Sequence, residues 1–154
     1  MKEIKLTSGK VTLVDDEDYG WLSEYRWWLN SGYAMRNRIE KGVSKTIHMS
    51  RVIMNAPDDM FVDHINRNTL DNRRENLRIC TKRENCANRG VNRNNTSGVK
   101  GVSWDTESNK WKAQLRHNYK LINLGRFTNI SDASEAYANG AKKYFGEFAH
   151  IERE

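Results

Sequence analysis

Apolar and polar residues alternate over short stretches in the first half of the chain, which predicts several short strands. A Ser8-Gly9 turn signal separates the first two strands, so we expect them to form a hairpin. Acidic residues at 15–18 offer N-caps for a short helix that continues to Tyr25, and residues 50–54 fit a further helical turn. The strands expected in this half are 4–6, 11–14, 27–30, 33–38 and 43–48.

The middle of the chain predicts two further strands and a helix around a polar loop. Residues 62–65 and 77–80 have strand composition, and most residues between them are Asn, Arg or Asp. Thr81 and Glu84 have the spacing of a capping box, so a helix is expected to start near Lys82 and to run to about Arg89.

The final third changes its pattern after the polar stretch 90–98, which we interpret as a linker. Ser131 or Asp132 is expected to cap a helix that reaches about Phe145, and its small apolar residues at 3.6-residue spacing indicate close packing on a sheet. Trp104 is expected in the core of this part, with a DNA contact as the alternative. The strands expected here are 99–104, 110–116 and 120–127.

Charge is distributed unevenly along the 154 residues, whose net charge is +6. Residues 1–62 hold as many acidic as basic side chains, whereas 63–90 and 91–154 each hold an excess of +3. The later two thirds of the chain therefore favour an acidic partner such as nucleic acid.

Cys80 and Cys86 are the only cysteines and form no Cys-x-x-Cys pair, so no structural zinc site is expected and both are interpreted as buried free thiols. No apolar run approaches the roughly 20 residues that cross a bilayer, and the first residues lack the apolar core of a signal peptide. We therefore expect an intracellular protein without a membrane partner.

Residues 62–88, VDHINRNTLDNRRENLRICTKRENCAN, concentrate the groups that cut a phosphodiester: an imidazole base, oxygen ligands for a hard cation, and cations to hold a polyanion. This segment resembles the core of HNH nucleases, in particular the phage and intron-encoded homing endonucleases. The resemblance covers roughly residues 2–88, and the order strand, loop, strand, helix is that of a ββα-metal fold.

The resemblance implies roles for an adjacent pair. His64 would be the catalytic general base, since a neutral imidazole takes a proton from water near pH 7. Asp63 would be a metal ligand, because carboxylate oxygen suits Mg²⁺ or Mn²⁺. Side chains of successive strand residues point to opposite faces, so Asp63 and His64 are expected to share a site only at a distorted strand or at its edge.

Two asparagines complete the motif. Asn76 would brace the loop that holds His64, because an amide donates and accepts hydrogen bonds at once; an ordinary turn or cap is the competing interpretation. Asn85 would complete the metal site through its carbonyl oxygen. Asn88 lies on nearly the same helix face and is a rival metal ligand, although the spacing in the family favours Asn85.

Arginines in the same segment are candidate phosphate contacts, with a solvated surface as the alternative. Arg73 and Arg78 are preferred for DNA binding. The full set is Arg67, Arg73, Arg74 and Arg78.

The final third resembles the Apetala or ethylene-response-factor type of DNA-binding domain, in which one helix backs three antiparallel strands. The matching pieces are VKGVSW, WKAQLR, NLGRF and DASEAYANGAKKYFGEFAHI, within about 97–151. Alternation along WKAQLR gives one apolar face and one polar, basic face suited to DNA. Matched position by position, the resemblance implies DNA contacts at Lys100, Gln114, Arg116 and Asn123.

The expected fold class is therefore α+β: a ββα-metal (HNH) nuclease core with N-terminal strands, followed by a small three-stranded antiparallel sheet with one helix. The expected domains are a nuclease domain at 1–89, a linker at 90–98 and a DNA-binding domain at 99–154. The expected activity is that of an HNH-type endodeoxyribonuclease that nicks or cleaves double-stranded DNA at a preferred site. It would use one Mg²⁺ or Mn²⁺ and no small-molecule cofactor, as a monomer in the cytoplasm of a bacterial host if a phage encodes it.

Two other classes of protein fit parts of the pattern. One is a non-catalytic sequence-specific DNA-binding protein that keeps the nuclease scaffold. The other is a phage nuclease subunit that is active only with a partner. The intact set of Asp63, His64, Asn76 and Asn85 favours an active enzyme.

Overall fold

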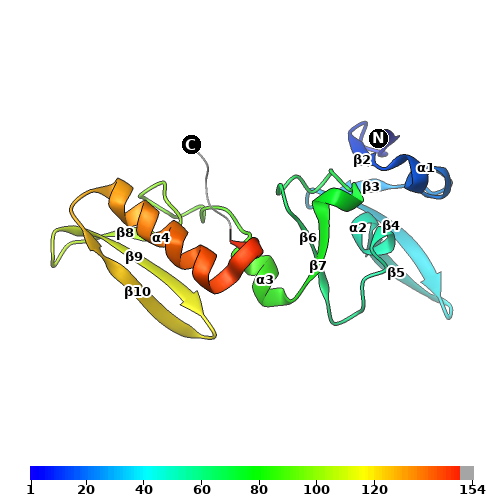
Figure 1. Cartoon of the computed structure of the whole chain (residues 1–154). Helices are drawn as coiled ribbons and strands as arrows, with labels where there is room; N and C mark the ends of the chain where they lie inside the picture. Colours follow the sequence, from blue (N-terminus) through cyan, green and yellow to red (C-terminus); the bar gives the residue numbers. More distant parts are fainter. Residues whose placement is uncertain (150–154) are drawn as a thin grey trace. The chain divides into compact units, whose positions relative to one another are not determined.

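The computed structural model describes residues 1–149 and divides the chain into two compact units, Met1–Asn85 and Cys86–Glu154 (Figure 1). Small antiparallel sheets and helices occur in both units, so the protein is of the mixed α+β class. Each unit has a hydrophobic core of its own. Within residues 1–149, none of the helices combines the length and the apolar character that a bilayer crossing needs.

The first unit begins with a hairpin, as its turn signal predicts, followed by a helix and a three-stranded antiparallel sheet of order β3-β4-β5. Trp27 is fully buried in its core. The indole N–H of Trp27 donates to the Leu22 carbonyl oxygen at 2.9 Å, so the one polar atom of this side chain is paired. The elements are β1 (Lys2–Lys5), β2 (Val11–Val14), α1 (Asp16–Ser23), β3 (Trp28–Asn30), β4 (Tyr33–Glu40), β5 (Val43–His48) and α2 (Met49–Ile53).

A second hairpin carries the residues of the nuclease-like segment. β6 (Phe61–His64) pairs antiparallel with β7 (Leu77–Cys80), and the chain between them is a long polar loop that ends in the 3-10 turn η1 (Arg74–Asn76). Asp63 lies opposite Arg78 in this pair, and His64 lies opposite Leu77.

The predicted capping box starts the next helix, α3 (Lys82–Ala87). The Thr81 backbone N–H donates to the Glu84 carboxylate at 2.7 Å, and the Glu84 N–H donates to the Thr81 hydroxyl oxygen at 3.3 Å. The helix ends at Ala87 instead of continuing to Arg89.

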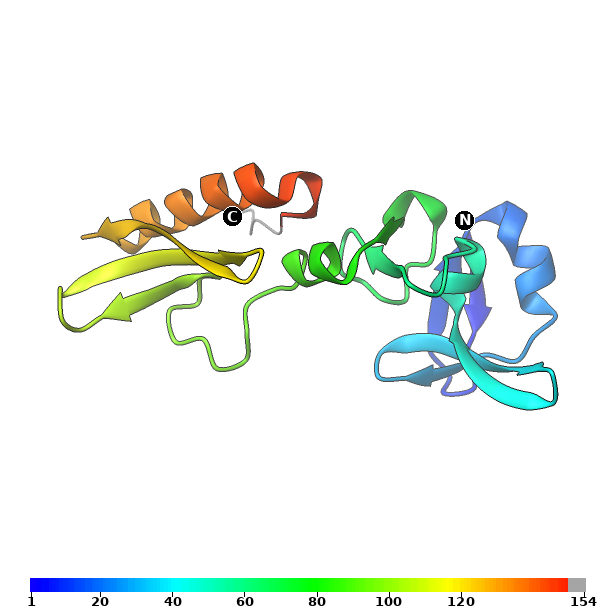
Figure 2. The same cartoon turned by 90° about the horizontal axis from the view of Figure 1, so that it is seen from below.

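The second unit is a three-stranded antiparallel sheet of order β10-β9-β8 with one long helix along one of its faces (Figure 2). The inward side chains Ala113 and Leu115 are buried beneath that helix, whereas Arg116 on the other face is exposed, as the alternation predicts. The elements are β8 (Val102–Asp105), β9 (Lys110–His117), β10 (Lys120–Phe127), α4 (Ile130–Phe145) and the 3-10 turn η2 (Gly146–Phe148).

Two glycines allow α4 to lie as close to the sheet as its small residues predict. A Cβ atom at Gly140 would lie 2.7 Å from the Leu124 side chain. Gly101 adopts φ +70°, and a Cβ atom there would lie 2.1 Å from the Tyr137 ring of α4. A larger residue at Gly140 would force the Leu124 side chain to move, and one at Gly101 would also meet the Gln114 carbonyl oxygen at 2.7 Å.

The structure corrects several sequence expectations. α4 begins at Ile130, and its N-cap residue is Asn129 instead of the predicted Ser131 or Asp132. Trp104 is 45% exposed instead of buried and packs edge-on against Trp111 at a centroid distance of 5.0 Å. Cys86 is exposed, although Cys80 is buried as expected.

The N-cap of α1 is Asp15, within the stretch predicted to supply it, but the acidic side chains there have other partners. Asp15 makes no side-chain cap bond. Its carboxylate instead accepts the backbone N–H of Arg74 at 2.8 Å, and Asp18 accepts two bonds from the guanidinium of Arg74, each 2.8 Å long. These carboxylates therefore fasten the distant turn η1 to the start of the chain.

Candidate active site

Asp63 and His64 end strand β6, and both side chains are almost fully buried, at 5% and 4% exposed. The two side chains point to opposite faces of the strand, as alternation predicts, and so contact different residues. Asp63 meets Arg78 of β7, whereas His64 lies beside Asn72 and the ring of Tyr33. The end of β6 therefore carries a buried carboxylate and a buried imidazole on adjacent residues.

The Asp63 carboxylate is held by Arg78. Nε and Nη2 of Arg78 donate to the same carboxylate oxygen, Oδ2, at 2.9 and 2.8 Å. Both side chains of the pair are largely buried, so the ion pair is shielded from solvent.

Cys80 connects Asp63 to the first turn of α3. Burial and the Asp63 and Glu84 carboxylates together raise the pKa of the Cys80 thiol to about 11, although Arg78 and a backbone N–H of Asn85 oppose the shift. Asp63 and the start of α3 are thus both neighbours of this thiol. Asn85 itself is partly exposed, whereas Asn88, past the end of α3, is buried.

His64 is set up to be neutral. Burial lowers the pKa of its imidazole, and the contact with the Asn72 carboxamide oxygen and the carboxylates of Asp63 and Asp71 oppose that shift only in part. At neutral pH the ring therefore carries no charge and has one nitrogen lone pair that can take a proton.

Asn72 is a residue of this site that sequence analysis missed. Its Oδ1 lies 3.3 Å from Nε2 of His64, and its Nδ2 donates to the hydroxyl oxygen of Thr12 at 2.8 Å. Asn72 and Thr12 are 1% and 0% exposed. Asn72 is one of several amides in a polar loop, and its partner Thr12 is 60 residues away, so no local signal marks either residue.

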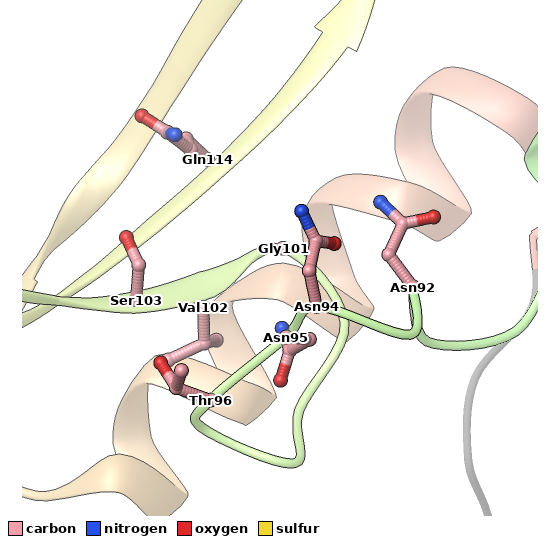
Figure 3. A pocket seen from close by; sticks show the side chains of 8 residues that line it. All are labelled: Asn92, Asn94, Asn95, Thr96, Gly101, Val102, Ser103 and Gln114. Atoms are coloured by element: carbon pink, nitrogen blue, oxygen red, sulfur yellow. The ribbon is translucent and has the colours of Figure 1, made fainter.

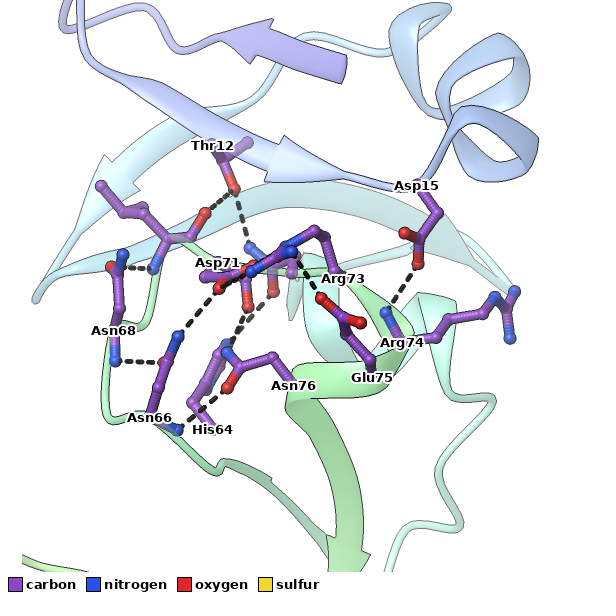
Figure 4. Close-up of polar contacts among 12 residues, drawn as sticks. Thr12, Asp15, His64, Asn66, Asn68, Asp71, Arg73, Arg74, Glu75 and Asn76 are labelled. Atoms are coloured by element: carbon purple, nitrogen blue, oxygen red, sulfur yellow. Dashed lines mark hydrogen bonds and ion pairs between the residues drawn. The ribbon is translucent and has the colours of Figure 1, made fainter. Parts of the chain in front are cut away.

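Asn76 ties together both ends of the loop between β6 and β7 (Figure 4). Its Nδ2 donates to the Asp71 carbonyl oxygen at 2.7 Å, and its Oδ1 accepts the backbone N–H of Asn66 at 2.9 Å. The side chain is 5% exposed, so these bonds replace water for both backbone groups. This is the arrangement that a bracing role requires.

The same loop is joined to strand β2. The Leu13 backbone N–H donates to the Leu70 carbonyl oxygen, and the Asn72 N–H donates to the Leu13 carbonyl oxygen, both at 2.8 Å. These bonds form a short parallel bridge between Leu13 and Asp71. The N-terminal hairpin therefore supports the loop on which His64 depends.

The candidate phosphate-binding arginines are engaged with carboxylates. Arg73 donates to both oxygens of Asp71, at 2.7 and 2.8 Å, and also contacts Glu75. This pairing holds the pKa of Asp71 below its ordinary value. Arg74 and Arg78 are paired as described above, whereas Arg67 is exposed at φ +64°.

No group of three or more His, Cys, Asp and Glu side chains that could hold a metal ion occurs within residues 1–149. The oxygen donors of the motif are the Asp63 carboxylate, which Arg78 contacts, and the carboxamide of Asn85 in α3. A hard cation such as Mg²⁺ is commonly held by only one or two carboxylates, with water and substrate phosphate as further ligands. The donor set therefore fits Mg²⁺ or Mn²⁺ and does not fit structural zinc.

The second unit presents a polar sheet face opposite α4. Gln114 of β9 lies directly across from Asn123 of β10, and Arg116 lies two pairs further along, across from Leu121. Lys100, also predicted to contact DNA, donates through its ammonium group to the carbonyl oxygens of Ala87, at 2.6 Å, and Arg89.

A polar pocket of about 430 Å³ borders this sheet face (Figure 3). Gln114 and Ser103 line it from neighbouring strands, and the loop before β8 adds the carboxamides of Asn92 and Asn94. Asn95 stabilises this loop. Its Nδ2 donates to the Val99 carbonyl oxygen at 3.0 Å, and its Oδ1 accepts the Gly98 backbone N–H at 2.7 Å.

Comparisons with known proteins agree with the sequence motif. The family model described as HNH endonuclease matches residues 55–87. An uncharacterised HNH endonuclease of Acanthamoeba polyphaga mimivirus is 29% identical over 143 residues, which is 92% of this chain and 74% of the mimivirus protein. Protein 3.8 of Escherichia phage T7 is 35% identical over 73 residues, or 44% of this chain, and the match spans 60% of the phage protein. No solved structure matches the chain.

Proposed function

We propose that this protein is a metal-dependent DNA endonuclease of the HNH type, which hydrolyses phosphodiester bonds of double-stranded DNA at a preferred site. The observation that carries the proposal is the buried neutral imidazole of His64 beside the buried carboxylate of Asp63, at the end of one strand. Both residues lie within the stretch 55–87 that matches the HNH endonuclease model.

In this proposal the ββα-metal core consists of β6, β7 and α3 and belongs to a nuclease domain at 1–89. Asp63 and Asn85 would hold one Mg²⁺ or Mn²⁺ through carboxylate and carboxamide oxygens. Such an ion supplies electrostatic stabilisation of charge that develops on phosphate oxygens during hydrolysis. Asn88 remains the alternative to Asn85.

The chain's own residues perform the remaining steps. His64 removes a proton from the attacking water, which a neutral imidazole does at physiological pH. Asn76 keeps the loop beside His64 in place through its two backbone bonds. Arg78 orients the Asp63 carboxylate. A DNA phosphate would compete with that carboxylate for the Arg78 guanidinium. At Arg73 the phosphate would compete with the Glu75 carboxylate.

The proposed reader of DNA is the second unit, an Apetala-type domain at 99–154 that follows the linker 90–98. A three-stranded sheet can enter the major groove, where amides pair with adenine and arginine with guanine or phosphate. Gln114, Asn123 and Arg116 are the proposed contacts, since they share the exposed sheet face. Lys100, bonded to two carbonyl oxygens, contributes charge at the edge of this surface.

Purified full-length protein incubated with supercoiled plasmid tests the proposal. With Mg²⁺ or Mn²⁺ we expect open-circular DNA to form first, because one catalytic set per chain cuts one strand per binding event. EDTA is expected to stop the reaction. Gel electrophoresis over time separates supercoiled, open-circular and linear DNA.

The Arg78–Asp63 ion pair is the one observation that favours a non-catalytic DNA-binding protein, because it engages the carboxylate that a metal would need. Plasmid that is retarded on a gel but stays supercoiled with either cation would support that alternative. Cleavage that appears only after a host extract is added would indicate a partner-dependent subunit. Either result overturns the proposal for the protein alone.

Arg116→Ala is expected to weaken DNA binding through the second unit. Removing one phosphate contact should lower the slope of log affinity against log salt by about 1. Fluorescence anisotropy with a labelled duplex in EDTA, at several salt concentrations, measures the affinity without cleavage.

Lys142→Ala is the matched control for Arg116→Ala. It removes the same charge from the same unit, but Lys142 is exposed on α4, the helix that covers the opposite sheet face. Equal losses for the two variants would mean that net charge alone binds the DNA, and that this sheet face is not the interface.

A further inference from the structure

Residues 92–98 lie in the stretch interpreted as a linker, yet they form a closely bonded loop of the second unit. The backbone N–H of Asn95 donates to the Asn92 carbonyl oxygen at 2.9 Å, and the Asn95 side chain makes the two bonds described above. The Ser97 hydroxyl donates to the Val102 carbonyl oxygen at 2.7 Å, which joins the loop to β8. The polar pocket beside this loop therefore has a wall of defined shape (Figure 3).

Four polar side chains that line the pocket make no hydrogen bond within residues 1–149: the carboxamides of Asn92, Asn94 and Gln114 and the hydroxyl of Ser103. In Figure 3 the side chains of Asn92, Asn94 and Ser103 point the same way from their backbones. Their donors and acceptors are therefore available to a ligand in the pocket.

The lining of the pocket indicates the chemistry of that ligand. None of the eight described residues that line it is charged or aromatic. A phosphate group is normally held by Lys or Arg, and a base that has left the stack is normally held against aromatic rings. Neither ligand finds such partners here, whereas the edge of a paired base needs neutral donors and acceptors.

A carboxamide matches adenine best among the four bases. Its N–H donates to adenine N7 while its oxygen accepts a hydrogen bond from the N6 amino group, both in the major groove. Thr96 also lines the pocket, and the methyl group of threonine suits the methyl group of thymine, the partner of that adenine. The lining therefore fits an A·T pair.

We propose that this pocket is a base-reading site, in which Asn92 and Asn94 recognise adenine of an A·T pair in the major groove. The site extends the reading surface from the sheet to the loop before β8. Gln114 connects the two parts, because it lies on the sheet face, lines the pocket and donates its backbone N–H to the Gly101 carbonyl oxygen at 2.9 Å. The inference rests on the proposed function, since it takes the second unit as the part that reads DNA.

Binding selection from a pool of randomised DNA duplexes tests the site. Full-length protein is mixed with the pool in EDTA, so that no metal-dependent cleavage occurs, and the bound duplexes are sequenced. We expect the wild type to enrich an A·T pair at one or two fixed positions of the selected site. Asn92→Ala or Asn94→Ala should reduce the preference for adenine about 5- to 150-fold at one position and leave the others unchanged, since a bidentate base contact discriminates by about this factor.

Asn92→Asp and Asn94→Asp add a measurement that a merely structural role would not affect. Aspartate has nearly the shape of asparagine, but its carboxylate only accepts hydrogen bonds and so matches the N4 amino group of cytosine. We expect at least one of the two variants to change the selected base at its position from adenine to cytosine.

Asn139→Ala is the matched control. It makes the same chemical change at an exposed position of α4, the helix that covers the opposite face of the sheet, and it should select the same sequences as the wild type. Neither Asn92 nor Asn94 is among the residues with positive φ, so alanine does not strain the backbone there. All three alanine variants should therefore melt close to the wild type by circular dichroism.

Selected sites that keep the same adenine in both Asn92→Ala and Asn94→Ala would overturn the inference. A loss of affinity that is equal for all sequences would overturn it as well, because that is the effect of a phosphate contact. A wild type that enriches no sequence would also rule out a base-reading site, even if it cleaved plasmid. A wild type that enriches A·T pairs at fixed positions but leaves plasmid intact with Mg²⁺ and with Mn²⁺ would count against the proposed function and not against this site.

Discussion

His64→Ala is expected to reduce plasmid cleavage by about 100- to 10,000-fold, the range that a positioned general base contributes. The variant removes the imidazole next to Asp63, and water does not ionise readily at neutral pH without a base. DNA affinity should stay close to that of the wild type, because the proposed sheet contacts lie in the other unit. Rates of open-circular product formation and anisotropy in EDTA measure the two quantities.

His64→Gln separates loss of the base from loss of packing. Glutamine fills most of the same buried volume and can donate an amide N–H to Asn72, yet it cannot accept a proton at neutral pH. We expect it to be nearly as inactive as His64→Ala while it melts closer to the wild type. Cleavage by His64→Gln at the wild-type rate would remove His64 from the mechanism.

Asn76→Ala is expected to lower both the free energy of unfolding and the cleavage rate. It leaves the Asp71 carbonyl oxygen without its buried bond and the Asn66 N–H without its partly buried bond. Two such unpaired groups cost about 2 to 4 kcal/mol in total. Thermal and urea unfolding followed by circular dichroism measure the loss, and plasmid nicking measures its effect on the site.

Asn68→Ala is the matched control, since it makes the same chemical change in the same loop. Asn68 is exposed, and its Oδ1 accepts the Leu70 N–H at 3.2 Å, so water can replace this bond. We expect a change of less than about 1 kcal/mol. If Asn68→Ala and Asn76→Ala were equally destabilising, Asn76 would not have the bracing part assigned to it.

Local signals predicted the elements of this chain well. The strands Val43–His48 and Leu77–Cys80 lie where their composition indicates, and the Thr81–Glu84 capping box starts α3 because both partners sit within one helical turn. The alternation in β9 likewise predicts which side chains face α4. Each of these signals depends on residues that are close together in the sequence.

The supports of the candidate site could not be predicted in the same way. Arg73, Arg74 and Arg78 look alike in sequence, yet each pairs with a different aspartate. Arg73 pairs with Asp71 two residues away, whereas the partners of Arg74 and Arg78 are distant in sequence. Arg74 meets Asp18 across 56 residues. Trp104 was misjudged because an aromatic residue at a strand end is exposed or buried according to how far the covering helix extends, which strand pattern does not encode.

The bonds between the loop and strand β2 also bear on how small a fragment of this chain could keep the proposed nuclease activity. The family model stops at residues 55–87, but Leu13, Asp15 and Asp18 hold that stretch from outside it. A fragment trimmed to the matched residues would expose the carbonyl of Leu70 and free the side chain of Arg74. Attempts to graft this motif onto another scaffold should therefore transplant the opening hairpin together with it.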